Sequence, residues 1–162
     1  LGMMMGPLVD EVQRTKVDGY VQGAVAEGGR VVVGGKRPEH LPDGFFYEPT
    51  LVADISNGAK ICQEEVFGPV LAVVSYDGDD DAVAVANDSI FGLSATVIGT
   101  DEERATAVAR RLRTGTVSIN GGMWYGPDTP FGGYKQSGIG REMGQLGFEE
   151  YLEVKALATP VE

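Results

Sequence analysis

Apolar segments with strand character alternate with segments of helical periodicity along most of this 162-residue chain. Residues 70–74 form a continuous apolar run, residues 79–87 carry apolar side chains at helical spacing, and residues 93–98 are a further strand candidate. Parallel strands that are buried on both faces have this appearance, and crossover helices connect them. The alternation therefore predicts an α/β fold in which helices flank a mostly parallel sheet.

The remaining elements continue this pattern. A helix is expected over residues 10–27, where Asp10 and Gln13 have the spacing of a capping box. Its apolar face is expected to consist of Val12, Val17, Tyr20, Val21, Ala24 and Val25. Thr100 and Glu103 form a second capping box, which predicts another helix. Further strands are expected at residues 30–33, 45–52 and 115–120, and a short helix near residues 142–147.

Two segments interrupt the regular pattern. Pro49 cannot donate a ladder hydrogen bond, so the strand over residues 45–52 is expected at a sheet edge or with irregular backbone. Residues 121–138 form a Gly-rich loop that contains Trp124 and Phe131 and is too long for a plain connection. Because this loop follows the carboxyl end of a predicted parallel strand, we expect it to have a functional role.

The charge balance excludes some classes of partner. With 13 basic and 24 acidic residues, the formal net charge is −11, which argues against nucleic acid. The opening residues show no basic leader, and no apolar run is long enough for a membrane span, so a cytoplasmic protein without a membrane partner is expected. The lone cysteine, Cys62, and the lone histidine, His40, do not make a convincing metal site, and His40 is expected on a surface loop.

Residues 64–70, with the sequence EEVFGPV, place two carboxylates and a phenyl ring directly before the apolar run. Gly68 and Pro69 give this segment a stiff, sharply turned backbone. A carboxylate can accept two hydroxyl hydrogen bonds, and a phenyl ring can support a planar ligand. The alternative is a solvated carboxylate pair followed by a core phenylalanine, and this segment alone leaves both interpretations open.

A second motif, residues 130–142 with the sequence PFGGYKQSGIGRE, favours the functional interpretation. Together with EEVFGPV, it resembles the C-terminal part of the catalytic domain in the NAD(P)-dependent aldehyde dehydrogenase superfamily. Further matching motifs are MGPLV at 5–9, GFFYEPT at 44–50, AND at 86–88 with GL at 92–93, and RTGTVSIN at 113–120. Because these motifs occur at compatible spacing, chance is a poor explanation for them.

The resemblance implies a function and a set of site residues. Members of the family oxidise an aldehyde to a carboxylic acid with NAD or NADP, through a thiohemiacetal and a thioester on a catalytic cysteine. By motif position, Glu65 matches the glutamate that binds the nicotinamide ribose, and Phe67 matches the aromatic residue beside that ribose. Phe131 matches the aromatic wall of the aldehyde tunnel. Glu64 matches a mainly structural position and is left outside the site.

The same resemblance places the catalytic residues upstream of Leu1. The nucleophilic cysteine, the general base, the oxyanion-hole asparagine and the dinucleotide-binding domain all precede the matched motifs in the family. We therefore expect no catalytic residue in this chain, and we expect the isolated chain to be inactive. Cys62 does not match the nucleophile, and no histidine or lysine clearly flanks it to lower its pKa, so a small buried thiol is the preferred interpretation.

The C-terminal residues predict an oligomer. Residues 1–149 are expected to be the C-terminal part of the catalytic domain, and residues 150–162 a strand arm with Leu152, Val154 and Ala156 on one face. In the family such an arm pairs with a neighbouring subunit, so the full-length protein is expected to be a homo-dimer or homo-tetramer; the alternative is a strand that closes its own sheet. Two other function classes stay open: a non-catalytic binding or assembly subunit derived from the family, and an unrelated parallel-sheet nucleotide-binding module.

Overall fold

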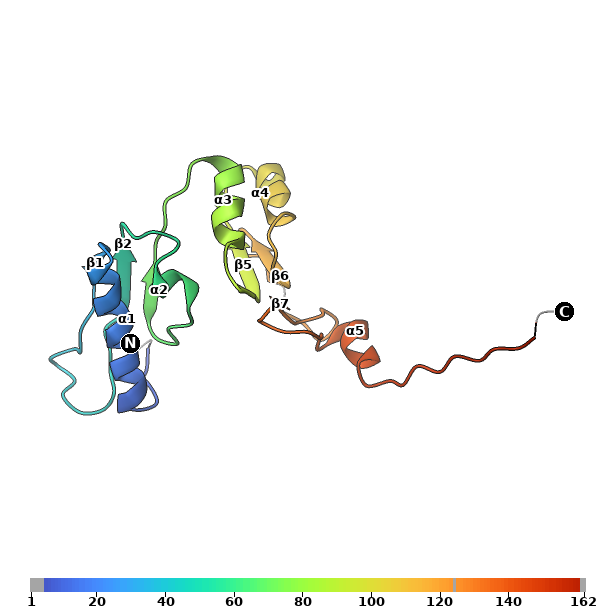
Figure 1. Ribbon diagram of the computed structural model, residues 1–162, viewed down its shortest axis with the longest axis horizontal. Coiled ribbons are helices and arrows are strands. Elements are labelled where there is room, and N and C mark those ends of the chain that lie inside the picture. Colours follow the sequence, from blue (N-terminus) through green and yellow to red (C-terminus); the bar gives the residue numbers. More distant parts are fainter. Residues whose placement is uncertain (1–4, 124, 161–162) are drawn as a thin grey trace. The chain divides into compact units, whose positions relative to one another are not determined.

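The computed structural model describes residues 5–123 and 125–160. Residues 1–4, on which the expected absence of a leader partly rests, lie outside the described residues. The chain divides into two compact units, one within residues 1–77 and the other within residues 78–162. Both units contain helices and a parallel strand pair, so the predicted α/β class is confirmed (Figure 1). The described strands form three small sheets and not one continuous sheet.

Helix α1, Glu11–Ala26, is the longest described helix, and it begins where the sequence predicts. The Asp10 carboxylate accepts a hydrogen bond from the Gln13 backbone N–H at 2.8 Å, which caps the first turn. The buried face consists of Val17, Val21 and Ala24. Val12 and Val25, which were expected on the same face, are exposed, and Val12 lies on the opposite side of the helix. Neither α1 nor any other described helix is long and apolar enough to cross a membrane.

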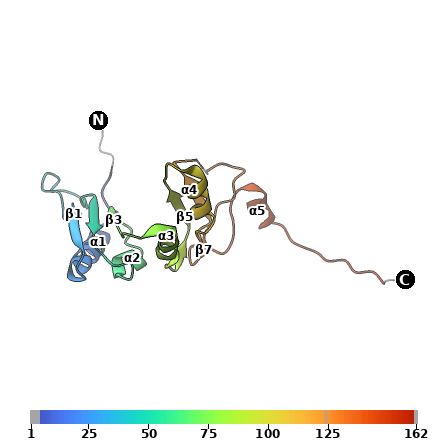
Figure 2. The same cartoon turned by 90° about the horizontal axis from the view of Figure 1, so that it is seen from above.

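The sheet of the first unit has the order β1-β2-β3, with α1 packed beside it (Figure 2). Strand β2, Thr50–Ala53, pairs antiparallel with β1, Arg30–Val33, and parallel with β3, Val70–Ala72. The expected edge position is therefore wrong, because β2 is the central strand. The other expectation, irregular backbone, is confirmed: residues 45–49 are not in a strand, and β2 begins at Thr50. Pro49 lies one residue before the strand and outside the ladder, where its missing N–H removes no hydrogen bond of the strand.

Strand β3 is less buried in this chain than its apolar sequence predicts. Val70 and Ala72 pack against the core cluster of the first unit. Leu71 and Val73, which point the other way, are 62% and 44% exposed. The continuous apolar run predicted cover on both faces. Within the described residues only one face is covered.

The second unit contains the predicted crossover. Strands β5, Ser94–Val97, and β6, Thr116–Ile119, are parallel, and α4, Glu102–Ala109, connects them and packs on both. Helix α4 begins at a different cap from the predicted one. The carboxylate of Asp101, and not the hydroxyl of Thr100, accepts the capping hydrogen bond, from the Arg104 backbone N–H at 3.0 Å. Helix α3, Gly78–Asn87, precedes these strands and agrees with the helix expected at residues 79–87.

The segment after β6 holds a strand that the sequence did not predict. Strand β7, Tyr134–Lys135, lies within the predicted loop and pairs antiparallel with β4, Phe91–Gly92. Helix α5, Gly144–Glu149, follows and corresponds to the short helix expected near residues 142–147. Trp124, which the predicted loop also includes, lies outside the described residues.

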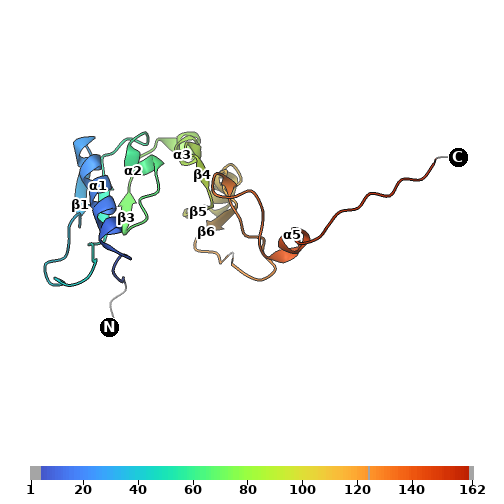
Figure 3. The ribbon, with the colours of Figure 1, turned by 60° about the horizontal axis from the view of Figure 1, so that its bottom comes forward.

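The C-terminal arm forms no strand within the single chain. Residues 153–160 have neither helical nor strand structure, and all of them are exposed (Figure 3). The alternative in which the arm closes its own sheet is therefore not seen in the described residues. Pairing of the arm with another subunit stays a prediction, as do the domain limits 1–149 and 150–162. Residues 161–162 lie outside the described residues.

Candidate functional site

The EEVFGPV segment, termed the 64–70 turn, connects the single-turn helix α2, Lys60–Gln63, to β3. Phe67 has a φ of 55°, a left-handed conformation that bulky residues rarely adopt. At the next position, a Cβ on Gly68 would overlap Cγ2 of Val17 on α1. Glycine at this position therefore allows the turn to lie directly against α1.

The two carboxylates of the 64–70 turn have different surroundings. Glu64 Oε2 accepts a hydrogen bond from the Tyr20 hydroxyl at 2.8 Å and lies 3.8 Å from Lys60 Nζ. This hydrogen bond is the main reason that the pKa of Tyr20 is raised. The Glu65 side chain is exposed, and no hydrogen bond or ion pair among the described residues uses its carboxylate. Glu64 thus holds the turn to α1, whereas Glu65 is available to a ligand.

The Phe67 ring faces solvent and does not belong to the core. It is 71% exposed, so the alternative interpretation of a core phenylalanine is wrong. An exposed ring two residues from an available carboxylate presents an apolar plane and a charged hydrogen-bond acceptor together. This combination suits a ligand that carries both hydroxyl groups and a planar ring.

Helix α1 supports the 64–70 turn through a side chain that sequence reasoning missed. Gln13 Nε2 donates to the backbone carbonyls of Val66 at 3.0 Å and Phe67 at 2.8 Å. The capping-box spacing predicted only a capping role for Gln13, since its other partners lie 53 and 54 residues away along the chain. The sequence offered one signal for this role: Gln13 is a polar side chain in the first turn of α1, one helical turn before the buried Val17.

Phe131 lies in the second unit and is partly buried. Its backbone N–H donates to the Glu142 carbonyl at 2.8 Å, and its own carbonyl accepts from the Glu142 N–H at 2.7 Å. A cavity of about 340 Å³ adjoins it, lined by Leu93, Phe131, Gly132, Gly133, Ser137, Gly138, Gly140, Arg141, Glu142 and Glu150. The 64–70 turn belongs to the first unit. Each candidate therefore rests on the geometry of its own unit.

Cys62 does not have the surroundings of a nucleophile. The thiol is partly buried, and burial raises its pKa, with a further increase from the negative charge of Glu27. A nucleophilic cysteine requires the opposite, a stabilised thiolate. The local electrostatics therefore agree with the interpretation of Cys62 as a structural thiol.

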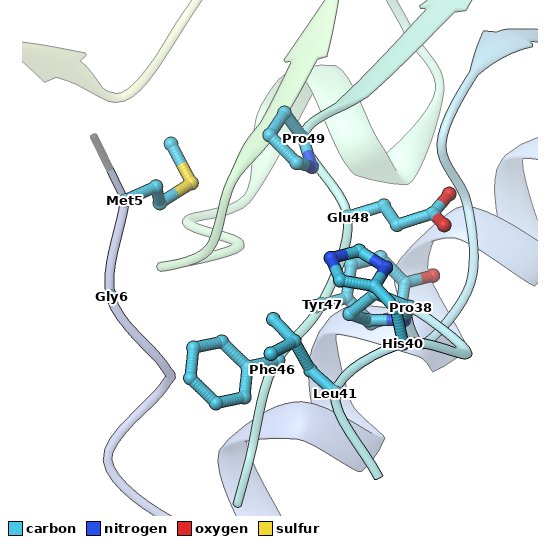
Figure 4. Close-up of a pocket in the computed structure, with 9 residues that line it drawn as sticks. All are labelled: Met5, Gly6, Pro38, His40, Leu41, Phe46, Tyr47, Glu48 and Pro49. Carbon is cyan, nitrogen blue, oxygen red and sulfur yellow. The ribbon is translucent and has the colours of Figure 1, made fainter. Parts of the chain in front are cut away.

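A largely apolar recess of about 280 Å³ lies beside the loop that carries His40. Figure 4 shows its lining residues: Met5, Gly6, Pro38, His40, Leu41, Phe46, Tyr47, Glu48 and Pro49. Its permanent charge is the negative one of Glu48, so a phosphate-bearing ligand would find no fixed cation there. In the described part of the chain, no group of three or more His, Cys, Asp or Glu residues could hold a metal ion. The recess offers apolar contact without a constellation for catalysis.

The chain is similar to known enzymes over nearly its whole length. The family model described as "Aldehyde dehydrogenase family" matches residues 2–157. The betaine aldehyde dehydrogenase of Bacillus subtilis is 49% identical over 152 residues, which are 93% of this chain and 31% of that protein. The chain thus spans about a third of the length of this relative.

Solved structures agree with this similarity. A Mycobacterium tuberculosis aldehyde dehydrogenase complexed with NAD+ matches with a TM-score of 0.86 at 51% identity, over 90% of this chain and 30% of that chain. The betaine aldehyde dehydrogenase of Staphylococcus aureus in complex with NAD+ matches with a TM-score of 0.88 at 46% identity, over 92% and 30%. Because the family model also covers nearly all residues, the chain belongs to the aldehyde dehydrogenase family.

Proposed function

We propose that this chain is the C-terminal part of an NAD(P)-dependent aldehyde dehydrogenase, which oxidises an aldehyde to a carboxylic acid through a cysteine thiohemiacetal and thioester. Family membership supports the reaction class. The observation that carries the proposal is the 64–70 turn, where the available Glu65 carboxylate stands two residues from the exposed Phe67 ring. NAD+ in the matching structures supports NAD as the cofactor.

The 64–70 turn fits the ribose and the ring of a nicotinamide cofactor. The Glu65 carboxylate has lone pairs available for two ribose hydroxyls, and a charged acceptor makes these hydrogen bonds strong. The Phe67 ring supplies a planar surface beside them. When bound, such a cofactor accepts the hydride that aldehyde oxidation releases; the turn itself contributes binding and orientation.

The other parts of the proposal follow from the remaining site residues. Phe131 is assigned to the wall of the aldehyde site by its motif position, and the cavity that it lines in the second unit supports this assignment. The catalytic thiolate is assigned to the part of the protein upstream of Leu1, because Cys62 does not match the nucleophile by motif position. Its partly buried thiol, whose pKa is raised, supports this assignment. The isolated chain therefore contributes cofactor and substrate contacts but no turnover of its own. A cytoplasmic location and a homo-dimer or homo-tetramer complete the proposal.

Glu65→Gln in the full-length protein tests this function. The substitution keeps the shape of the side chain but replaces a charged acceptor with a weaker neutral one. A hydrogen bond to a charged group contributes roughly 1.5 to 3 kcal/mol, so hydride transfer should slow on the order of tenfold to a hundredfold through misplacement of the nicotinamide. The measurement is the rate of NADH or NADPH formation in a single turnover, together with cofactor affinity.

Glu64→Gln is the matched control, because it changes the neighbouring carboxylate, whose partners are Tyr20 and Lys60. It should lower thermal stability more than it changes cofactor kinetics. A Glu65→Gln protein with the wild-type rate and the wild-type cofactor affinity would exclude Glu65 as the ribose ligand.

A further inference from the structure

The chain contains two Asn-Gly dipeptides, Asn57-Gly58 and Asn120-Gly121. An asparagine that precedes glycine can lose its side-chain amide without an enzyme, because glycine has no Cβ and its backbone nitrogen can approach the asparagine side chain closely. The reaction requires the backbone to bring that nitrogen against Cγ of the asparagine. The two dipeptides differ in backbone conformation, and they should therefore differ in reactivity.

Asn120 lies in a tight turn with a left-handed backbone. The Gly122 N–H donates to the Ile119 carbonyl at 2.9 Å. The φ angles of Asn120 and Gly121 are 51° and 78°, which are typical of a type I′ turn. In the left-handed conformation the Cβ lies close to the carbonyl oxygen of its own residue. The next backbone nitrogen, on the other side of the carbonyl carbon, therefore points away from the side chain.

The side chain of Asn120 is held as well. Its Oδ1 accepts a hydrogen bond from the Gly99 N–H at 2.9 Å. Before the Gly121 nitrogen can reach Cγ, the turn has to open and the side chain has to leave the Gly99 N–H. The folded structure therefore protects Asn120, although this residue is exposed to solvent.

Asn57 lies in a turn of a different type. The Ala59 N–H donates to the Ser56 carbonyl at 3.0 Å and closes a four-residue turn. Neither Asn57 nor Gly58 has a positive φ, so the turn is of type I and Asn57 is right-handed. In this conformation the carbonyl oxygen is rotated away from the Cβ, and the next backbone nitrogen lies nearer the asparagine side chain.

The surroundings of Asn57 leave the reacting nitrogen accessible. The Gly58 N–H lies 3.3 Å from Ser56 Oγ, which is beyond the usual range of an N–H···O hydrogen bond. Gly58 and Ser56 are exposed, so water reaches the turn. Gln63 Nε2 donates to the Asn57 carbonyl at 2.8 Å and holds the peptide bond between Asn57 and Gly58 in its orientation.

We infer that Asn57 is a site of spontaneous deamidation and that Asn120 is protected from the same reaction. The Gly58 nitrogen forms a bond to Cγ of Asn57, the bond from Cγ to Nδ2 breaks, and the amide group leaves as ammonia with the proton of the Gly58 nitrogen. Water then opens the succinimide at either of its carbonyls. The product is aspartate or isoaspartate at position 57, and no oxidant or reductant takes part.

The test is peptide mapping by mass spectrometry of the full-length protein after storage at mildly alkaline pH, at a temperature where it stays folded. Asn57 should convert about tenfold faster than Asn120, because Asn120 must first lose the hydrogen bonds of its turn. Protein unfolded in guanidinium chloride is the control. Both turns are lost there, so the two asparagines should convert at similar rates.

Gly58→Ala is the matched variant. A Cβ on Gly58 would meet only Ser56 Oγ, at 3.8 Å, which is an ordinary contact, so the fold accommodates this change. The added methyl group crowds the attacking nitrogen, so conversion at Asn57 should slow several-fold while conversion at Asn120 stays the same. Equal rates in the folded protein, faster conversion of Asn120, or conversion of Asn57 only after unfolding would overturn the inference.

Discussion

Lys135 is a second residue whose side chain holds backbone carbonyls. Its ammonium donates to the Asn87 and Ser89 carbonyls at the end of α3. The Asn87 side chain accepts from the Arg113 N–H at 2.7 Å and donates to the Arg111 carbonyl at 3.0 Å. These two side chains tie the end of α3 to β7 and to the segment that leads into β6.

Lys135→Met should therefore destabilise the second unit. The substitution keeps much of the apolar stem but leaves two carbonyls without their charged donor, which should lower the free energy of unfolding by about 1.5 to 3 kcal/mol. Urea denaturation followed by circular dichroism measures the change. Lys155→Met is the matched control, since Lys155 is exposed on the arm and should change stability little. Equal stability of the two variants would show that the Lys135 hydrogen bonds contribute no net stability.

Sequence motifs identified the residues that are proposed to face a ligand, but they did not identify the side chains that hold the backbone. Glu65 and Phe67 stand in a short motif, and the structure shows both side chains exposed on one turn. Gln13 and Lys135 act on carbonyls that lie at least 46 residues away along the chain. Any backbone carbonyl can accept such a hydrogen bond, so the local sequence around the donor does not predict which carbonyl is its partner.

At the scale of elements, charged pairs connect the acidic first turn of α3 to residues in and after α4. Arg104 donates to both carboxylate oxygens of Asp79, with Nη2 at 2.6 Å from Oδ1 and Nε at 2.9 Å from Oδ2. Arg111 Nη2 lies 2.7 Å from Asp80 Oδ1. The hydrogen bonds from Arg104 hold the pKa of Asp79 below its ordinary value.

The lowered pKa of Asp79 predicts a pH dependence of stability. An unfolded aspartate titrates near pH 3.9, so at acidic pH the unfolded state binds more protons than the folded state. The contribution of Asp79 is therefore present above that pH and is lost as the pH falls through the folded pKa. Asp79→Asn should lower the free energy of unfolding at pH 7. Between pH 7 and pH 3 this free energy should fall less in the variant than in the wild type, as measured by urea denaturation.

Asp43→Asn is the control for this pH dependence, because Asp43 is exposed on a loop and has no ion pair among the described residues. Its free energy of unfolding should change with pH as that of the wild type does. Identical slopes for Asp79→Asn and the wild type would show that the contact with Arg104 does not contribute to acid sensitivity.

Local signals predicted most elements, and two of the exceptions depend on distant partners. Caps and apolar periodicity identified α1, and β-branched runs identified β1 and β6. The two-residue strand β7 was missed because it exists through its pairing with β4. The position of β2 at the centre of its sheet was also missed, since strand order depends on where other segments of the chain fold back.

At the scale of the whole molecule, the chain is a part of a larger fold. It spans about a third of the length of the relatives that it matches. The apolar run at β3 predicted a strand covered on both faces, and in this chain Leu71 and Val73 are exposed. We expect other segments of the full-length protein to cover these two side chains. The sequence of this chain does not identify those segments.

The arm gives a prediction for the assembled protein. Deleting residues 150–162 from the full-length protein should convert the oligomer to smaller species in light scattering, while much of each subunit stays folded by circular dichroism. The reason is that residues 153–160 form no strand within their own chain, so deleting them should mainly remove contacts with the neighbouring subunit. An unchanged oligomeric mass after deletion would rule out the arm as the main subunit contact.

The exposed arm also limits how tightly such a contact can form. Fixing one backbone residue costs about 1 to 2 kcal/mol in conformational entropy, so ordering the segment would cost on the order of 10 kcal/mol. Complete burial of Leu152 and Val154, which are exposed here, would return about 1.5 to 3 kcal/mol each, and each ladder hydrogen bond about 0.5 to 1.5 kcal/mol. The cost of ordering the segment therefore offsets much of this gain. Assembly through the arm should therefore respond to protein concentration, and truncation of one of these apolar side chains should shift the monomer–oligomer equilibrium about tenfold or more.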